Sequence, residues 1–132
     1  MAIFYNKIER GNPMDTQAPK KWYAVLKNVG MIGEKEVAKL VSDETTINRK
    51  EAEMALDQFE KIMVRLLLDG HSVQLGDLGS FYLTCNSEGV ATKEELTATN
   101  IKNLNIRFTP GKEVKEAIQH ATFKDLETLA KK

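Results

Sequence analysis

The segment from Asn48 to Gly70 constrains the fold more than any other part of the chain. Asn48 is a typical N-cap residue, and Glu51 stands three residues later, in the capping-box position. Apolar residues then recur at helical spacing, and Gly70 follows as a C-terminal stop signal. This apolar face consists of Ala52, Ala55, Leu56, Phe59, Ile62, Met63, Leu66 and Leu67. The spacing predicts one long amphipathic helix.

The last two turns of this helix are apolar on nearly every side, and only Arg65 interrupts the run. A helix of this kind needs cover on several sides, and the rest of so small a chain covers one side comfortably. We therefore predict a homodimer in which a second copy supplies the remaining cover. The predicted dimer interface consists of Phe59, Ile62, Met63, Val64, Leu66, Leu67 and Leu68.

The other segments predict an α+β chain without internal repeats. Alternating apolar residues indicate strands, and apolar residues three and four positions apart indicate helices. The predicted elements are two strands within residues 1–30, a helix over Glu34–Glu44, the long helix, strands over 72–75, 80–85 and 104–108, and a closing helix marked by Val114, Ala117, Ile118 and Ala121. Residues 86–103 are polar and turn-like.

The net charge is zero, but the charges are unevenly distributed. Residues 1–30 carry five basic and two acidic groups, residues 31–85 carry six and ten, and residues 86–132 carry eight and seven. Proteins that bind phosphates usually have a basic surface. A nucleic-acid surface on this chain must therefore be a local patch.

Several classes of protein are excluded by the composition. The single cysteine, Cys85, rules out an internal disulfide and fits a reducing compartment, so a cytoplasmic location is expected. No transmembrane span is expected, because the longest apolar run is broken by Arg65. The N-terminus lacks the layout of a signal peptide. His71 and His120 are isolated, and no spacing matches a metal site. We expect no enzyme activity, catalytic residue, cofactor or metal.

Three collinear segments resemble the bacterial HU/IHF histone-like DNA-binding proteins. Ile47–Glu53 (INRKEAE) resembles the start of the long second helix of HU. Val73–Phe81 (VQLGDLGSF) resembles the core motif V-x-L-x-G-F-G-x-F, with Asp77 in place of its glycine and Leu78 in place of its first aromatic residue. Phe108–Lys115 (FTPGKEVK) resembles the F-x-x-G-K-x-L-K that opens the last helix.

The resemblance covers about residues 33–123, and the stretch before it is similar to the extended HU-related group common in Bacteroides-type bacteria. It implies an HU/IHF-like fold: a helix–helix body, a three-stranded antiparallel saddle with a β-ribbon arm, and a C-terminal helix. The implied domains are an N-terminal β extension over 1–30, a DNA-binding domain over 31–123 with its arm at about 86–103, and a C-terminal tail over 124–132.

The resemblance also implies a function, which is architectural binding of double-stranded DNA by a nucleoid-associated homodimer. Such proteins hold, bend and condense DNA with little sequence preference, since arms in the minor groove insert apolar wedges and DNA deformability does much of the selecting. The alternative is an HU-like module that has lost most DNA affinity and contacts a protein partner through its saddle or arms.

Backbone-phosphate contacts are expected at two glycine-containing positions. Gly79 and Ser80 lie where the family places a backbone N–H and a hydroxyl against phosphate, although a tight hairpin turn explains both residues equally well. Gly111 and Lys112 open the closing helix, where the dipole attracts anions, and Lys115 follows one turn later. A solvated helix start is the alternative for these residues.

Arg107 is expected to point away from the core, beneath the arms. It could contact backbone phosphate there, although an exposed arginine often has no such role. In the arm, Lys93 and Lys102 face three glutamates, and the family's arginines and wedge proline are missing. The possible intercalating wedge is then Val90 or Leu96, although both could equally pack within the arm or against a partner. We expect weaker DNA binding and less bending than in a basic HU.

A basic-aromatic cluster near residue 20 could extend the DNA surface. Lys20 and Lys21 are its candidate phosphate contacts, next to Trp22 and Tyr23 and near Lys27. The preferred interpretation of this cluster is a strand whose aromatic residues cover the domain core.

Overall fold

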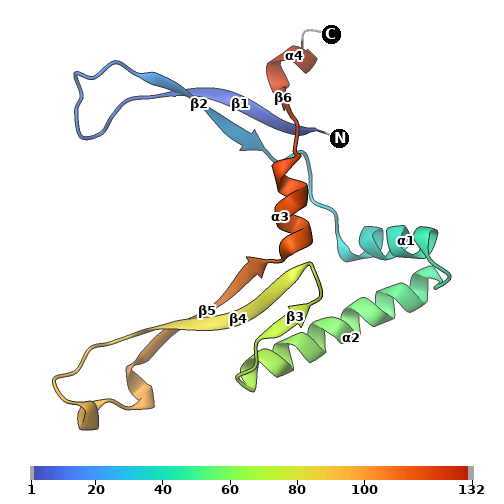
Figure 1. Ribbon diagram of the computed structural model, residues 1–132, viewed down its shortest axis with the longest axis vertical. Helices are drawn as coiled ribbons and strands as arrows, with labels where there is room; N and C mark the ends of the chain where they lie inside the picture. The colour runs from blue at the N-terminus through green and yellow to red at the C-terminus, as the bar shows by residue number, and fades with distance from the viewer. Residues whose placement is uncertain (1, 131–132) are drawn as a thin grey trace. The chain divides into compact units, whose positions relative to one another are not determined.

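The computed structural model describes residues 2–130 and divides into two compact units. Unit 1 combines the residues up to Ile32 with those from Ile118 onward, and unit 2 is Gly33–Ala117. Each unit contains its own three-stranded sheet (Figure 1). The fold is therefore mixed α+β, as the sequence predicts.

Helices α1 and α2 of unit 2 begin and end where the sequence predicts. Helix α1 spans Glu34–Glu44 and helix α2 spans Arg49–Leu68. The side chain of Asn48 accepts a hydrogen bond from the Glu51 amide at 2.9 Å, which caps α2 at its N-terminus. At the other end Gly70 adopts a φ of +91°, which a residue without a Cβ accommodates at little cost.

The sheet of unit 2 is antiparallel, in the order β3-β4-β5. Its strands are β3 (Val73–Leu75), β4 (Gly79–Ser87) and β5 (Ile101–Pro110). The last two are longer than predicted, because pairing continues as far as Ser87 and Ile101. The register shifts between Thr84 and Asn86, opposite Asn103, whose φ of +50° marks a bulge.

A loop of residues 88–100 joins β4 to β5 and contains two 3-10 turns, Lys93–Glu95 and Ala98–Asn100. Helix α3 spans Lys112–Gln119 after β5. The sequence predicted this helix, but it ends before Ala121, which lies outside it.

Unit 1 is built around the two N-terminal strands. Strand β1 (Ile3–Arg10) pairs antiparallel with β2 (Lys21–Lys27). Strand β6 (Phe123–Asp125) lies parallel on the other side of β1, and helix α4 (Leu126–Ala130) follows it. The sequence indicated no regular element in this last stretch.

An ion pair joins β1 to β6 in unit 1. The Lys7 ammonium lies 2.8 Å from the Asp125 carboxylate, and this hydrogen-bonded partner raises the pKa of Lys7. The contact spans the parallel pairing, in which Tyr5 lies opposite Asp125.

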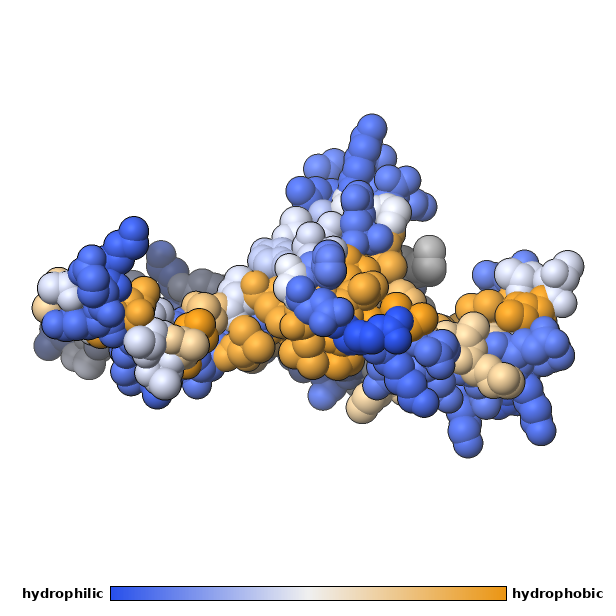
Figure 2. Space-filling view, turned by 90° about the horizontal axis from the view of Figure 1, so that it is seen from below, coloured by the Kyte–Doolittle hydropathy of each residue, from blue (hydrophilic) through white to orange (hydrophobic). Residues whose placement is uncertain are grey.

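Few side chains are buried in a single copy. Among the described residues, the buried apolar ones are Ala38, Ala52 and Leu67. Figure 2 shows a broad area of exposed apolar side chains on the side of the molecule seen from below. A chain of this length normally buries a larger core, so much apolar surface is left exposed in a single copy.

Within residues 2–130, helices are all too short or too polar to cross a bilayer.

Candidate nucleic-acid interface

One face of the unit 2 sheet is polar. Residues directly opposite each other in an antiparallel sheet lie on the same face, and alternate residues share it. This polar sheet face comprises Gln74, Ser80, Tyr82, Thr84, Asn86, Lys102, Asn105, Arg107 and Thr109. The Thr109 hydroxyl donates a hydrogen bond to the Tyr82 hydroxyl at 3.2 Å. Strands β3, β4 and β5 contain no acidic residue.

Arg107 lies in the middle of this face, directly opposite Tyr82, and it is exposed. It is thus on the opposite side of β5 from Ile106 and Phe108, as the alternation predicts. The row of hydroxyls beside it was not singled out from the sequence. The sequence signal for this row of hydroxyls is the alternation of Ser80, Tyr82 and Thr84. The alternation indicates a shared polar face only once the pairing of β4 with β5 is known.

The two glycine-containing segments predicted to contact phosphate lie side by side. The amide of Gly111 donates a hydrogen bond to the carbonyl oxygen of Leu78 at 2.8 Å. A methyl group on Gly111 would collide with the backbone of Asp77. This amide is already bonded within the turn, which argues against a phosphate contact through the amide itself. The contact at Gly111 stays a prediction.

Gly79 is buried and has a φ of +148°. A Cβ there would collide with the Thr109 carbonyl oxygen and with the Phe108 ring. The geometry of the tight turn is therefore sufficient to explain the glycine at this position. Its neighbour Ser80 is half-buried on the polar sheet face.

Two exposed lysines lie on the first turn of α3. Lys112 is its first residue, and Lys115 donates its amide to the Gly111 carbonyl oxygen at 3.1 Å. The earliest amides of a helix have no acceptor within it, so they remain suited to an anion. This keeps Lys112 as a candidate contact next to the Leu78–Gly111 junction.

The 88–100 loop carries the expected arm residues. Lys102, at its base, lies 3.7 Å from the carboxylate of Glu88, and both side chains are more than half exposed. Lys93 is exposed in the first 3-10 turn. Val90 and Leu96 are exposed and line the same hollow of about 400 Å³ within the loop.

The predicted dimer residues on α2 differ in exposure. Val64 and Leu68 are 53% and 68% exposed, and Phe59 is also exposed. Ile62, Met63 and Leu66 are half-buried. Leu67 is only 5% exposed, so it belongs to the core of its own chain and offers little surface to a partner.

The opposite face of the unit 2 sheet is apolar and largely exposed. It comprises Val73, Phe81, Leu83, Cys85, Ile101, Leu104, Ile106 and Phe108. Phe81 and Phe108 form a ring pair with centroids 4.8 Å apart. A hollow of about 460 Å³ lies between the end of α2 and this sheet, lined in part by Leu68, Leu83 and Leu104.

The basic-aromatic cluster near residue 20 lies in unit 1. Lys21 begins β2, and Lys20 precedes it. Trp22 and Tyr23 are 67% and 49% exposed. The preferred interpretation, in which these rings cover a core, is therefore wrong for the single chain.

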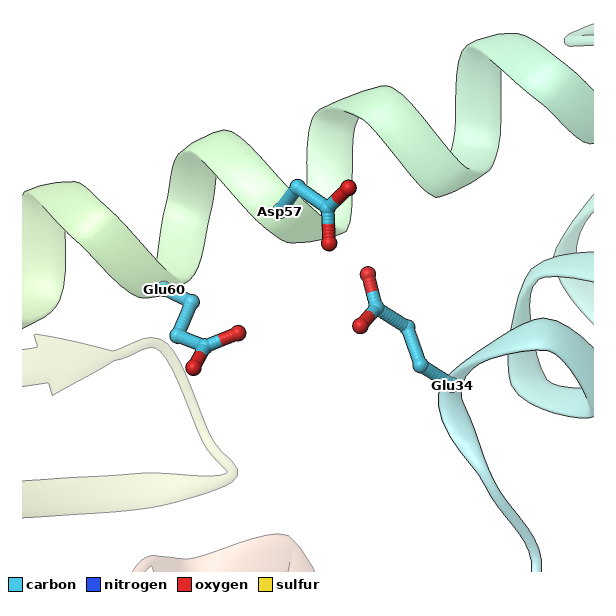
Figure 3. A group of neighbouring side chains, drawn as sticks. All are labelled: Glu34, Asp57 and Glu60. Atoms are coloured by element: carbon cyan, nitrogen blue, oxygen red, sulfur yellow. The ribbon is translucent and has the colours of Figure 1, made fainter.

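Three carboxylates gather between α1 and α2, as Figure 3 shows. The oxygens of Glu34, Asp57 and Glu60 lie within 4.8 Å of one another, and all three side chains are exposed. A hydrogen bond with Asp57 raises the pKa of Glu34. The acidity of residues 31–85 is therefore concentrated on the helices: apart from Asp69 and Asp77, all its acidic residues lie on α1 or α2.

Comparison with known proteins identifies the family. A family model described as an HU domain fused to wHTH, Ig or glycine-rich motifs (HU-HIG) matches residues 1–125. The chain belongs to this HU-HIG family. No curated protein matches this HU-HIG chain.

Solved structures share the fold of this HU-HIG chain. One is a protein from Bacteroides vulgatus ATCC 8482 whose description proposes DNA binding, with 17% identity, a TM-score of 0.66, and coverage of 95% of this chain and 48% of the other. Another is Anabaena HU in a cocrystal with DNA, with 19% identity, a TM-score of 0.54, and coverage of 67% and 99%. The chain thus spans about half the length of the Bacteroides protein.

Proposed function

We propose that the chain binds double-stranded DNA as a homodimer, with little sequence preference, through the polar sheet face. Its role is then architectural: it holds or bends DNA in the nucleoid. Family membership and the likeness to a fold that has been crystallised with DNA support this proposal.

The observation that carries the proposal is the separation of charge between helices and sheet. Eight of the fifteen acidic residues of unit 2 lie on α1 and α2, and none lies on its strands. The polar sheet face presents Arg107 and also Lys102, which is paired with Glu88 of the adjoining loop. Hydroxyl and amide side chains, which commonly bond to phosphate oxygens, surround these cations. A neutral chain can therefore still offer DNA a locally positive surface.

The apolar surface on the other side of the same sheet supports the proposed homodimer. Ile106 and Leu104 are each 58% exposed there. Leu104 lines the hollow at the end of α2, and Ile106 is paired with Leu83, which also lines it. A second copy offers an equally apolar surface and covers both, as a self-complementary two-fold interface requires. The two polar sheet faces are then available to one duplex.

The 88–100 loop is the proposed arm. Lys93 and Lys102 are its proposed contacts to the DNA backbone, and Val90 or Leu96 is the wedge between base steps. Because Glu88 neutralises Lys102, the arm releases few counterions when it meets DNA, and binding is weaker than in a basic HU. On α3, Lys112 and Lys115 add phosphate contacts.

One observation favours the alternative, an HU-like module for a protein partner. Val90 and Leu96 line one hollow in a loop whose cation at the base is already paired with a carboxylate. Such a loop suits an apolar segment of a protein better than it suits phosphate.

A mobility shift with two short duplexes of unrelated sequence, at about 50 and 200 mM salt, separates the two functions. The proposal predicts similar affinities for both sequences and a large loss at the higher salt. Arg107→Gln weakens binding to both, whereas Arg49→Gln, which removes the same charge from the start of α2, changes it little. No binding at the lower salt, or an equal effect of the two variants, contradicts the proposal.

A further inference from the structure

The sheet of unit 1 has a cationic face that the DNA surface on unit 2 does not account for. The β1–β2 register places Arg10 opposite Lys21, Ile8 opposite Tyr23, and Phe4 opposite Lys27. The β1–β6 register adds Lys124, also opposite Phe4. Paired residues share a face, so these four cations lie on one side of the sheet.

The carboxylates of these strands lie on the other side. Glu9 is paired with Trp22, and Asp125 is paired with Tyr5 and bonded to Lys7. The cationic face therefore has no acidic strand residue to neutralise it. Among the strand residues, the charged groups on this face are therefore all cationic.

A hollow of about 590 Å³ opens at the loop end of this face. Arg10, Lys21 and Tyr23 line it together with residues of the connecting loop, among them Asn12 and Pro19. It is thus bounded by two cations that are paired across the strands, by an aromatic ring and by residues of the loop. Within the described part of the chain, none of the residues that line it is acidic.

The loop that completes the hollow is held by its own hydrogen bonds. The Asn12 side chain accepts from the Met14 amide at 2.9 Å, and the Asp15 side chain accepts from the Gln17 amide at 3.0 Å. The Asp15 amide in turn donates to the Asn12 carbonyl oxygen at 3.2 Å. Because Asp15 is engaged in this turn, the loop's one carboxylate is not among the lining groups.

We propose that this hollow binds a nucleotide of single-stranded DNA. Arg10 presents a fork of donors that matches a phosphate, and Lys21 adds a second cation opposite it. Tyr23 offers a ring on which a base can stack. A base within a duplex is already stacked on its neighbours, so only an unpaired one reaches the ring inside the hollow.

This site is separate from the proposed duplex surface, because its residues belong to unit 1 and the polar sheet face belongs to unit 2. A protein with both surfaces can bind duplex DNA through one and an unpaired nucleotide through the other. Each surface can be removed without changing a residue of the other.

The test is fluorescence anisotropy of the full chain with a labelled short oligothymidine, run beside a fully paired duplex. The double variant Arg10→Gln/Lys21→Gln is expected to weaken oligothymidine binding at least about tenfold, which corresponds to about 1.4 kcal/mol. Duplex binding is expected to change less than about threefold. Arg107→Gln is expected to show the opposite pattern, which distinguishes failure of this inference from failure of the proposed function.

Two matched controls distinguish binding in the hollow from non-specific electrostatic attraction of the oligothymidine. Lys27→Gln/Lys124→Gln removes two charges from the same face, at the far end of the strands, and should leave oligothymidine binding nearly unchanged. Tyr23→Leu should weaken it, whereas Trp22→Leu, on the opposite face, should not. Equal losses in the two double variants, or equal losses of oligothymidine and duplex, overturn the inference.

Discussion

The amide of Gly111 donates a hydrogen bond to the carbonyl oxygen of Leu78 at 2.8 Å. This bond ties the turn between β3 and β4 to the residue just before α3, and it positions the end of β5 beside Gly79. The geometry of the polar sheet face therefore depends on two glycines that touch neighbouring backbone.

Gly111→Ala is expected to destabilise the chain by about 2 kcal/mol or more, because its methyl group would collide with the Asp77 backbone. Gly79→Ala should cost a similar amount, since it adds a strained φ to a collision with Thr109. Urea denaturation measures both. Gly89→Ala is the control, since nothing lies within 4 Å of a Cβ there, and a loss as large as that of Gly111→Ala would refute the steric explanation.

Glu88→Gln is expected to strengthen duplex binding. The Lys102–Glu88 pair is exposed, so it contributes at most about 1 kcal/mol, and removing it frees Lys102 for phosphate. Affinity should rise by at most about fivefold per copy, with a steeper dependence on salt. Anisotropy at several salt concentrations measures this, with Glu94→Gln in the same loop as the charge-matched control. An equal gain from both variants would indicate a general charge effect.

Ile106→Lys is expected to convert the dimer to a monomer. Ile106 is 58% exposed on the apolar sheet face, and a lysine there places two charges in the proposed interface. Sedimentation velocity gives the mass. Met14→Lys, at a position 93% exposed in the unit 1 loop, should leave the dimer intact. A dimer that survives Ile106→Lys at low concentration would place the interface elsewhere.

Asp57→Asn is expected to lower the pKa of Glu34 toward its ordinary value, because the hydrogen bond with Asp57 is the main cause of the raised pKa. A raised carboxyl pKa means that the folded chain holds its proton more tightly than the unfolded chain. The associated stability is therefore lost as pH rises from the ordinary value of 4.5 through the raised one. NMR titration of Glu34 measures the shift, with Asp43→Asn on α1 as the control. A Glu34 titration unchanged by Asp57→Asn would refute the assignment.

The sequence predicted those elements that local signals specify. The N-cap at Asn48, the apolar spacing along α2 and the stop at Gly70 act within a few residues of one another, and the helix follows them. The alternation of Ile106, Arg107 and Phe108 likewise placed the arginine on the correct face of β5.

Features that depend on distant partners could not be predicted. Phe123–Asp125 is too short to show a strand pattern, and it is a strand because β1 pairs with it. The occupied amide of Gly111 depends on Leu78, and the neutralisation of Lys102 depends on Glu88. The four cations on one face of unit 1 became a group only through the register of β1 with both neighbours.

Native mass spectrometry of the chain with a short duplex tests the central claim most directly. We expect free protein at twice the chain mass of 14.9 kDa, and a complex of two chains with one duplex that dissociates as salt increases. A monomeric free protein that binds DNA as one chain per duplex would contradict the account, as would a stable dimer that binds no duplex at low salt.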